Sequence, residues 1–316
     1  MTFWPETANA IMTMQCGVCP VESDGRQLTA SSPSKLNVFL EVHGKRPDGF
    51  HELETVMLRT SLADQLSVRS TDDGLLTLRF SEATTAPMRA GVPLDDRNLI
   101  LRATAAVREA AGVQLGAEFV LHKRIPPQSG LGGGSGNAAT ALLLCRQLWN
   151  VTVPDAMLHD IAASLGSDIS FLLSGHAAAV CRGRGERVEP IPLAQSFHVV
   201  ALRPQAGNST ADVFRATTIS PPYRSIEPVV AALASSSGRQ LERQCFNRLT
   251  CAARELNPEM ARLMDRVTFV TRRPVFMSGS GSTIFVVANS RADAEQVAFT
   301  MREQLRVLPW VLKCGL

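Results

Sequence analysis

Five glycines fall within seven residues, Gly130 to Gly136, in the stretch KRIPPQSGLGGGSGNAATALLL. An Ala/Leu-rich segment follows them directly. A glycine-rich loop before a helix presents unpaired N–H groups and the positive end of the helix dipole, and it has no Cβ atoms that would hold a ligand away. The stretch therefore predicts a loop that binds a chain of phosphates. A flexible loop or close backbone packing is the alternative.

Two familiar phosphate-binding loops do not match this stretch. A Walker A loop needs a lysine after its last glycine, whereas Asn137 follows Gly136. A dinucleotide-binding fingerprint follows a strand directly and has a third glycine, whereas two prolines interrupt the strand here and Ser135 occupies the third position. The sequence therefore predicts a phosphate loop of another kind.

Two charged residues stand out from apolar surroundings. Lys35 begins a run that alternates like a strand, with Leu36, Val38, Leu40 and Val42 on one face and Lys35, Asn37, Phe39 and Glu41 on the other. Only four of the 32 basic residues are lysines, so Lys35 is a candidate for chemistry, and a charge that protects a strand edge is the alternative. Asp168 follows a helical segment, where a turn or cap is the ordinary role of an aspartate. Its neighbours Ser167, Ser170 and Phe171 predict a small uncharged pocket.

Helical and strand patterns that could position these residues alternate along the chain. Helices are expected from Asn98 through NLILRATAAVREAAG, from Ser135 onward, and in VPDAMLHDIAASLG, which ends at Gly166. Strands are expected in LNVFLEV, QLSVRS, LLTLRF, AEFVLHKRI, VFMSG and TIFVVA. This intermixing predicts an α+β protein.

Composition narrows the class of protein. A net charge of +3 with scattered acidic residues shows no basic stripe for nucleic acid, and no apolar run approaches the roughly 18 residues of a membrane span. The seven cysteines are odd in number and irregularly spaced, which predicts reduced thiols in a cytoplasm. Cys16 and Cys19 form a CxxC without partners for a metal site. Residues 1–30 are interpreted as an N-terminal extension.

PPQSGLGGGSGNAAT resembles the second conserved motif of the GHMP kinases, a superfamily that includes galactokinase, homoserine kinase and mevalonate kinase. Four more stretches resemble the superfamily in the same order along the chain: SPSKLNVFLEVHGKRPDGFHELETV, LGSDISFLLSGHAAAVCRGRGE, RPQAGNSTADVF and MSGSGSTIFVV. They are most similar to the branch that phosphorylates a cytidine diphosphate conjugate of methylerythritol, on the methylerythritol phosphate route to isoprenoid precursors.

The resemblance implies a two-domain GHMP kinase fold. It places a ribosomal-protein-S5-like, ATP-binding N-terminal domain at residues 31–181 and a ferredoxin-like substrate domain at residues 182–316. The active site is expected between them, in a monomer or homodimer. The implied reaction is transfer of phosphate from ATP to the C2 hydroxyl of the substrate.

The resemblance also implies roles for individual residues. Asp168 would take the proton of the hydroxyl, and Lys35 would favour the carboxylate form of Asp168 and stabilise the developing alkoxide. The substrate would be contacted by Asn37, Phe50, His51, Thr210 and Phe214. ATP is expected to bind together with Mg²⁺. Ser135 would lie nearest the metal, and no metal ligand is assigned. The residues expected to contact ATP are Asn98, Pro127, Gln128, Ser129, Gly130, Leu131, Gly132, Gly133, Gly134, Ser135, Gly136 and Asn137. A third Gly/Ser loop, from Ser278 to Ser282, would close against the phosphates, and a simple hairpin turn is the alternative.

Three positions depart from the pattern of this branch. Gly136 stands where a serine is usual, which would remove a hydroxyl near the phosphates. Gln128 and Ser129 replace smaller residues, and Arg248 follows Asn247 where an acidic residue is common. The alternatives are another small-alcohol kinase, the related ATP-dependent mevalonate-diphosphate decarboxylase, or a catalytically silent nucleotide-binding regulator on the same fold.

Overall fold

The computed structural model describes residues 22–23, 27–235 and 237–316. The strands are β1 (Glu22–Ser23), β2 (Leu28–Lys45), β3 (His51–Thr71), β4 (Leu76–Phe80), β5 (Gly116–His122), β6 (Ala178–Gly183), β7 (Arg187–Pro190), β8 (Phe197–Leu202), β9 (Phe246–Asn247), β10 (Phe276–Met277), β11 (Ile284–Ala288) and β12 (Trp310–Cys314). The helices are α1 (Ala86–Arg89), α2 (Leu99–Ala111), α3 (Gly133–Leu148), α4 (Asp155–Leu165), α5 (Ser167–Ser174), α6 (Thr210–Ala216), α7 (Glu227–Ala234), α8 (Gly238–Gln244), α9 (Thr250–Leu256), α10 (Pro258–Thr271) and α11 (Arg291–Leu305). Cys16 and Cys19 lie outside the described residues.

One hydrogen-bonded sheet runs through the molecule in the order β1-β2-β3-β12-β8-β11-β10, with antiparallel neighbours along this path. β2 and β3 are its longest strands and pair with each other over most of their length. β12 comes last in the chain but lies between β3 and β8, so it joins the two parts of the sheet.

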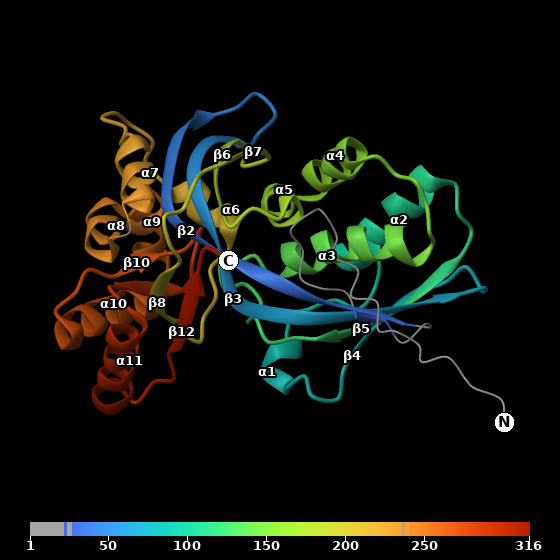
Figure 1. The fold of residues 1–316 in the computed structure, drawn as a ribbon. Helices are drawn as coiled ribbons and strands as arrows, with labels where there is room; N and C mark the ends of the chain where they lie inside the picture. Colours follow the sequence, from blue (N-terminus) through green and yellow to red (C-terminus); the bar gives the residue numbers. More distant parts are fainter. Residues whose placement is uncertain (1–21, 24–26, 236) are drawn as a thin grey trace.

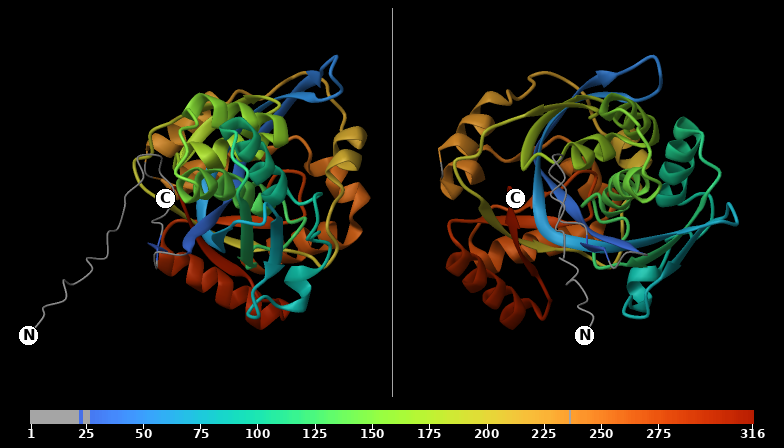
Figure 2. Two further views of the ribbon diagram at one scale, coloured as in Figure 1. Left: turned by 90° about the vertical axis from the view of Figure 1, so that its right-hand side faces the viewer. Right: turned by 45° about the vertical axis from the view of Figure 1, so that its right-hand side comes forward.

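Helices bury one face of the first part of this sheet and both faces of the second part. Helices α2 to α5 pack on the first part of the sheet around Leu66, Phe119 and Phe171, and Figure 1 shows them together on one half of the molecule. In the other half, α7 and α8 share a core with the odd-numbered residues of β8, whereas α10 and α11 share one with the even-numbered residues. Figure 2 shows β2 and β3 running between these two groups of helices.

Local signals place several elements as predicted. The helix expected after Asn98 is α2, whose Asn98 side chain accepts a hydrogen bond from Ile100 N and whose C-cap, Gly112, is left-handed with φ 65°. The helix expected to stop at Gly166 is α4. Beyond these predictions, a further short helix, α5, begins immediately after Gly166 and carries Asp168 in its first turn.

The alternation predicted for β2 is wrong beyond Asn37. The pairing with β3 skips Val38, since Asn37 lies opposite Met57 and Phe39 lies opposite Val56. Such a bulge inserts one extra residue and reverses the faces that follow it. Leu40 therefore follows Asn37 on the face of the cleft described below, and Glu41 turns away from that cleft.

The described strands begin before the predicted N-terminal domain. β2 starts at Leu28, and the side chains of Leu28 and Ala30 are buried in the core. The predicted division between residues 181 and 182 falls within β6, and this division stays a prediction.

Candidate active site

A cleft of about 1270 Å³ lies where the N-termini of α3 and α5 face β2, β3 and two loops of the second half of the chain. It brings together most of the residues predicted to act on the substrate or on ATP. Those lining it are Lys35, Asn37, Phe50, His51, Pro127, Gln128, Ser129, Gly130, Gly132, Gly133, Gly134, Ser135, Asp168, Thr210 and Phe214.

Four residues predicted to contact ATP do not line the cleft. Leu131 and Asn137 are buried. Asn98 uses its side chain as a helix cap, accepting from Ile100 N at 2.9 Å and donating to Pro93 O at 2.6 Å. Gly136 is the fourth.

Gly136 faces the backbone of β2 rather than the cleft. A Cβ atom at this position would lie 2.5 Å from the carbonyl oxygen of Pro33, which is closer than real Cβ atoms approach. The glycine is therefore required by the packing of α3 on β2. The expectation that Gly136 removes a hydroxyl from the phosphate site is wrong, because a side chain at this position would point toward β2 and away from the cleft.

The glycine loop owes its shape to glycines at two positions. Gly130 and Gly132 have φ angles of 76° and 68°, in the left-handed region that favours glycine. At Gly130 a Cβ would also lie 2.4 Å from the carbonyl oxygen of Ser278, so the third loop packs directly on this backbone. Gly132 is the N-cap of α3, and the N–H groups of the first turn that follows have no carbonyl within the helix to bond. This turn offers phosphate oxygens its free N–H groups and the positive end of the helix dipole.

Lys35 and Asp168 meet at the floor of the cleft. Their Nζ and Oδ2 atoms are 3.3 Å apart, and Lys35 is almost fully buried whereas the Asp168 side chain is 30% exposed. Asp168 lies in the first turn of α5, where the helix dipole favours a negative charge. Ser167 lines the cleft beside it, but Ser170 and Phe171 are buried on the core side of α5, so the predicted uncharged pocket is wrong for these two residues.

Asn37 is held in one orientation. Its Nδ2 donates to Thr55 Oγ1 at 2.9 Å, and its Oδ1 accepts from Lys35 Nζ at 2.5 Å. The Asn37 backbone N–H donates to Ser278 Oγ at 3.1 Å. These bonds fix the ammonium group of Lys35 between an amide oxygen and the Asp168 carboxylate.

Rings gather at the other end of the cleft. The rings of His51 and Phe214 stack with their centroids 5.0 Å apart and an interplanar angle of 26°. Phe50 is half exposed, and the guanidinium of Arg184 lies 4.8 Å from its ring centroid. Burial, together with the charge of Lys45, lowers the pKa of His51, so its imidazole is neutral at pH 7. A neutral imidazole offers one hydrogen-bond donor and one acceptor.

The third Gly/Ser loop is a hairpin between β10 and β11 that is bonded to the glycine loop. Ser278 Oγ donates to Gly130 O at 3.0 Å, and Thr283 N donates to Ser129 O at 3.0 Å. Thr210 shares a 2.8 Å hydrogen bond with Ser280, which ties α6 to the same hairpin. The hairpin therefore joins the two ends of the cleft.

Sequence reasoning did not single out several residues of the site. Arg184, Lys45 and Leu249 line the cleft, and Asn208 both lines it and donates to Ser280 O at 2.8 Å. Asn247 lies behind the hairpin and donates to Met277 O at 2.9 Å and Gly279 O at 2.7 Å. Asn208 belongs to the RPQAGNSTADVF stretch, which was its only signal.

No group of three or more His, Cys, Asp or Glu side chains that could hold a metal ion occurs in the part of the chain that the structure describes. The oxygen-bearing side chains that line the cleft include Ser135, in the first turn of α3, and Asp168, in the first turn of α5. Mg²⁺ in phosphoryl-transfer sites takes one or two protein oxygens and completes its shell with water and substrate phosphates. This donor set fits such an ion.

The family models agree with this architecture. The model described as "GHMP kinases N terminal domain" matches residues 98–183, and the one described as "GHMP kinases C terminal" matches residues 229–307. A relative from Pelotomaculum thermopropionicum is 36% identical over 277 residues, covering 87% of this chain and 94% of the relative. A chloroplastic relative from Mentha piperita is 38% identical over 270 residues, which are 83% of this chain and 64% of the relative. Both are named 4-diphosphocytidyl-2-C-methyl-D-erythritol kinase.

Solved structures show the same fold. A crystal structure of a 4-(cytidine 5'-diphospho)-2C-methyl-D-erythritol kinase is 34% identical, covers 91% of this chain and 99% of its own, and has a TM-score of 0.74. Homoserine kinase from Cytophaga hutchinsonii, at 18% identity and a TM-score of 0.64, shares the fold. The predicted α+β GHMP fold is thereby confirmed. The chain belongs to the GHMP kinase family, in the group of its 4-diphosphocytidyl-2-C-methyl-D-erythritol kinase relatives, and is an enzyme that phosphorylates a small alcohol.

Proposed function

We propose that the protein transfers the γ-phosphoryl group of ATP to the C2 hydroxyl of 4-diphosphocytidyl-2-C-methyl-D-erythritol, a step in the synthesis of isoprenoid precursors. The observation that carries the proposal is the Lys35–Asp168 pair, at 3.3 Å, in the same cleft as the glycine-rich N-terminus of α3. The names of the relatives support the choice of alcohol.

Asp168 accepts the proton of the C2 hydroxyl as the oxygen attacks the γ-phosphorus, and the bond from this phosphorus to the β,γ-bridging oxygen breaks so that ADP leaves. The ammonium of Lys35, 3.3 Å from the Asp168 carboxylate, stabilises negative charge on the attacking oxygen. Because Asn37 accepts from the same ammonium, the Lys35 side chain is already oriented before the substrate binds. Phosphoryl transfer needs mainly this kind of positioning and charge stabilisation from a protein.

The phosphates of ATP lie along Pro127 to Ser135, on the N–H groups of the first turn of α3. Mg²⁺ would be held by Ser135, with Asp168 close to it, and by phosphate oxygens. When bound, the ion neutralises charge that develops on the transferred phosphoryl group. Leu131, Gly136, Asn137 and Asn98 do not line the cleft.

The cytidine diphosphate end of the substrate lies among Phe50, His51, Thr210 and Phe214. A cytosine base stacks on an aromatic face, and the neutral imidazole of His51 bonds to its polar edge. Since Phe214 already stacks on His51, the base would use the remaining faces of Phe214 and Phe50.

We also place the enzyme in the cytoplasm, acting on small molecules as a monomer or homodimer without nucleic acid. Cys145, Cys181, Cys245 and Cys314 are buried free thiols, which fits a reducing compartment. No helix of the described residues is long and apolar enough to cross a membrane.

A turnover assay with ATP and the cytidyl substrate tests the proposal, with ADP release as the readout. Mevalonate and homoserine serve as competing alcohols. Turnover of the cytidyl substrate alone is expected. Preference for another alcohol would mean that the proposed substrate is wrong. Nucleotide binding without any ADP release would favour the catalytically silent regulator.

A further inference from the structure

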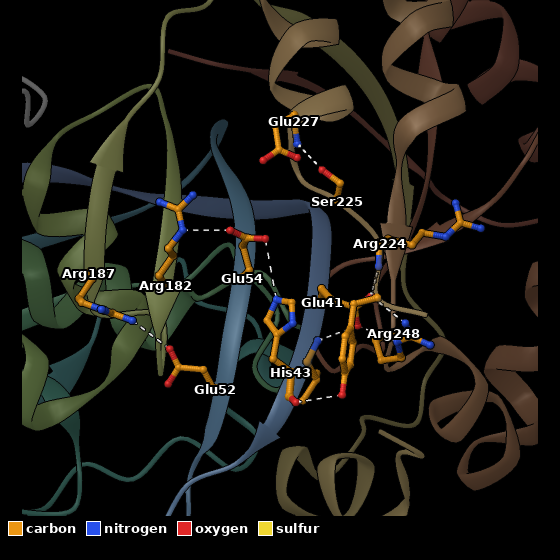
Figure 3. A network of polar contacts seen from close by, with 12 residues as sticks. Glu41, His43, Glu52, Glu54, Arg182, Arg187, Arg224, Ser225, Glu227 and Arg248 are labelled. Carbon is orange, nitrogen blue, oxygen red and sulfur yellow. Dashed lines mark hydrogen bonds and ion pairs between the residues drawn. The ribbon is translucent and has the colours of Figure 1, made fainter. Parts of the chain in front are cut away.

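A fully buried carboxylate lies on β2, on the side that faces away from the cleft. Glu41 accepts hydrogen bonds at both oxygens: Oε1 from Val42 N at 2.9 Å and Arg248 Nε at 2.7 Å, and Oε2 from Arg224 N at 2.9 Å and Arg248 Nη2 at 2.7 Å. Figure 3 shows Glu41 between Arg224 and Arg248. The carboxylate and the guanidinium form a two-point fork, which fixes their relative orientation.

This fork holds a segment that crosses from the second half of the chain. Arg248 Nη2 also donates to Pro222 O at 3.0 Å, and Tyr223 Oη donates to His43 O at 3.2 Å. The rings of Tyr223 and His43 lie 5.1 Å apart. Tyr223 and Arg224 are thus bonded directly to β2, and Pro222 is held through Arg248.

The fixed segment directly follows one wall of the cleft. Helix α6 carries Phe214, and the chain beyond it supplies Thr217 and Ile219, which line the cleft. Only two residues separate Ile219 from Pro222. The start of α6 is tied by Thr210 to the third Gly/Ser loop. The wall is therefore held at its beginning by that loop and at its end by the Glu41–Arg248 fork.

The residue before Arg248 serves the opposite end of the cleft. Asn247 bonds to the carbonyls of Met277 and Gly279, behind the loop that contacts Lys35 and the glycine loop. Asn247, the last residue of β9, and Arg248, which follows it, thus hold different parts of the site. Loss of the Arg248 side chain should consequently affect binding of the alcohol substrate more than binding of ATP.

We propose that the Glu41–Arg248 pair is a positioning device for the wall formed by Phe214, Thr217 and Ile219, and so sets the affinity for the alcohol substrate without touching it. The inference rests on the proposed function in one respect, that this wall contacts the cytidyl end. Arg248, which departs from the pattern expected at its position, acquires a role through its partner Glu41.

The test compares Arg248→Met with Arg273→Met. Arg273 makes the same two-point fork with Asp293, at 3.0 Å and 2.7 Å, but neither residue lines the cleft. For Arg248→Met, the KM of the cytidyl substrate is expected to rise about tenfold, while the KM of ATP and kcat change by less than about twofold. For Arg273→Met, the melting temperature should fall but neither KM should move.

Equal KM effects of the two variants would overturn the inference, because the pair would then act on stability alone. Glu41→Gln, which keeps the shape and loses the charge, covers the case in which Arg248→Met does not fold, and the same selective rise in KM is expected. Wild-type protein that ignores the cytidyl substrate would overturn the proposed function instead. The selective KM effect would then be measured with the alcohol that the enzyme accepts, and its absence would again overturn the inference.

Discussion

The chemistry depends on single side chains whose surroundings leave them few alternatives. Asp168→Asn keeps the size of the side chain but removes the group that takes the proton. We expect kcat to fall by roughly two to four orders of magnitude, with the Kd of ATP close to that of the wild type. Single-turnover kinetics and nucleotide titration measure the two quantities. Turnover at the wild-type rate would remove Asp168 from the reaction.

Phe214 tests the binding of the base. Phe214→Ala removes one stacking face, which should weaken binding of the cytidyl substrate by about 1–3 kcal/mol and leave the KM of ATP unchanged. Phe214 also packs against the core of the second half, so the melting temperature should fall moderately. A lower melting temperature without any selective effect on the cytidyl substrate would make Phe214 an ordinary core residue.

Glu41 should make stability depend on acidity. Burial by itself would raise the pKa of its carboxyl, but hydrogen bonds from Arg248, Arg224 N and Val42 N hold the pKa below its ordinary value. The stabilisation is therefore fully present above the unfolded-state pKa of about 4.3 and is lost as the pH falls through the lower folded-state pKa. Urea unfolding at pH 6 and at lower values down to about 3 should show a shallower loss of stability for Glu41→Gln than for the wild type. Parallel curves for both proteins would contradict this account.

The first turn of α3 contains a glycine that faces the cleft, Gly134, and one that packs on β2, Gly136. A Cβ at Gly134 would meet only Leu99 Cδ1, at 3.9 Å, beside the cleft, whereas a Cβ at Gly136 would collide with the backbone of β2. Gly134→Val should thus raise the KM of ATP strongly in a folded protein. Gly136→Ala should mainly lower the melting temperature, because the added Cβ collides with the backbone of β2. Melting curves and ATP titrations of both variants check this contrast, and unchanged ATP affinity in Gly134→Val would show that nucleotide does not approach this turn.

Periodicity and caps predicted the helices well, because those signals lie within a few residues of each other. The spacing of apolar residues placed α4, and Asn98 with Gly112 marked both ends of α2. The bulge at Val38 has no comparable signal, since it arises from pairing with β3, and it reversed the predicted faces of Leu40 and Glu41.

The residues that line the cleft could be predicted where they belong to a motif. The residues that hold the cleft in shape from behind could not. Lys35 and Asp168 are far apart in the sequence, and only the fold shows that they meet at 3.3 Å. The carbonyls held by Asn247 lie 30 and 32 residues away, so no local pattern could indicate them. Gly136 was expected at the phosphate site for the same reason, since its neighbour Pro33 is on another element.

The molecule should unfold as one unit. β12 pairs with β8 along its length and with β3 at Cys314, and Leu312 and Cys314 are buried. Removing residues 309–316 should therefore abolish the single unfolding transition and expose both halves to proteolysis. Circular dichroism melting and limited trypsin digestion would show this. A truncated protein that melts like the full chain would mean that β12 is dispensable to the sheet.

The central place of β12 also matters while the protein is being made. Synthesis at 5–20 residues per second takes roughly 15 to 60 s for a chain of this length, and β12 leaves the ribosome after all the other strands described. From the moment each is made until β12 emerges, β8 and the middle of β3, around Thr60, carry backbone groups on the edges that β12 later covers. Unpaired strand edges bind other chains readily. Nascent copies on neighbouring ribosomes are therefore the molecules most exposed to mispairing, and a chaperone that covers these edges should raise the yield of active enzyme.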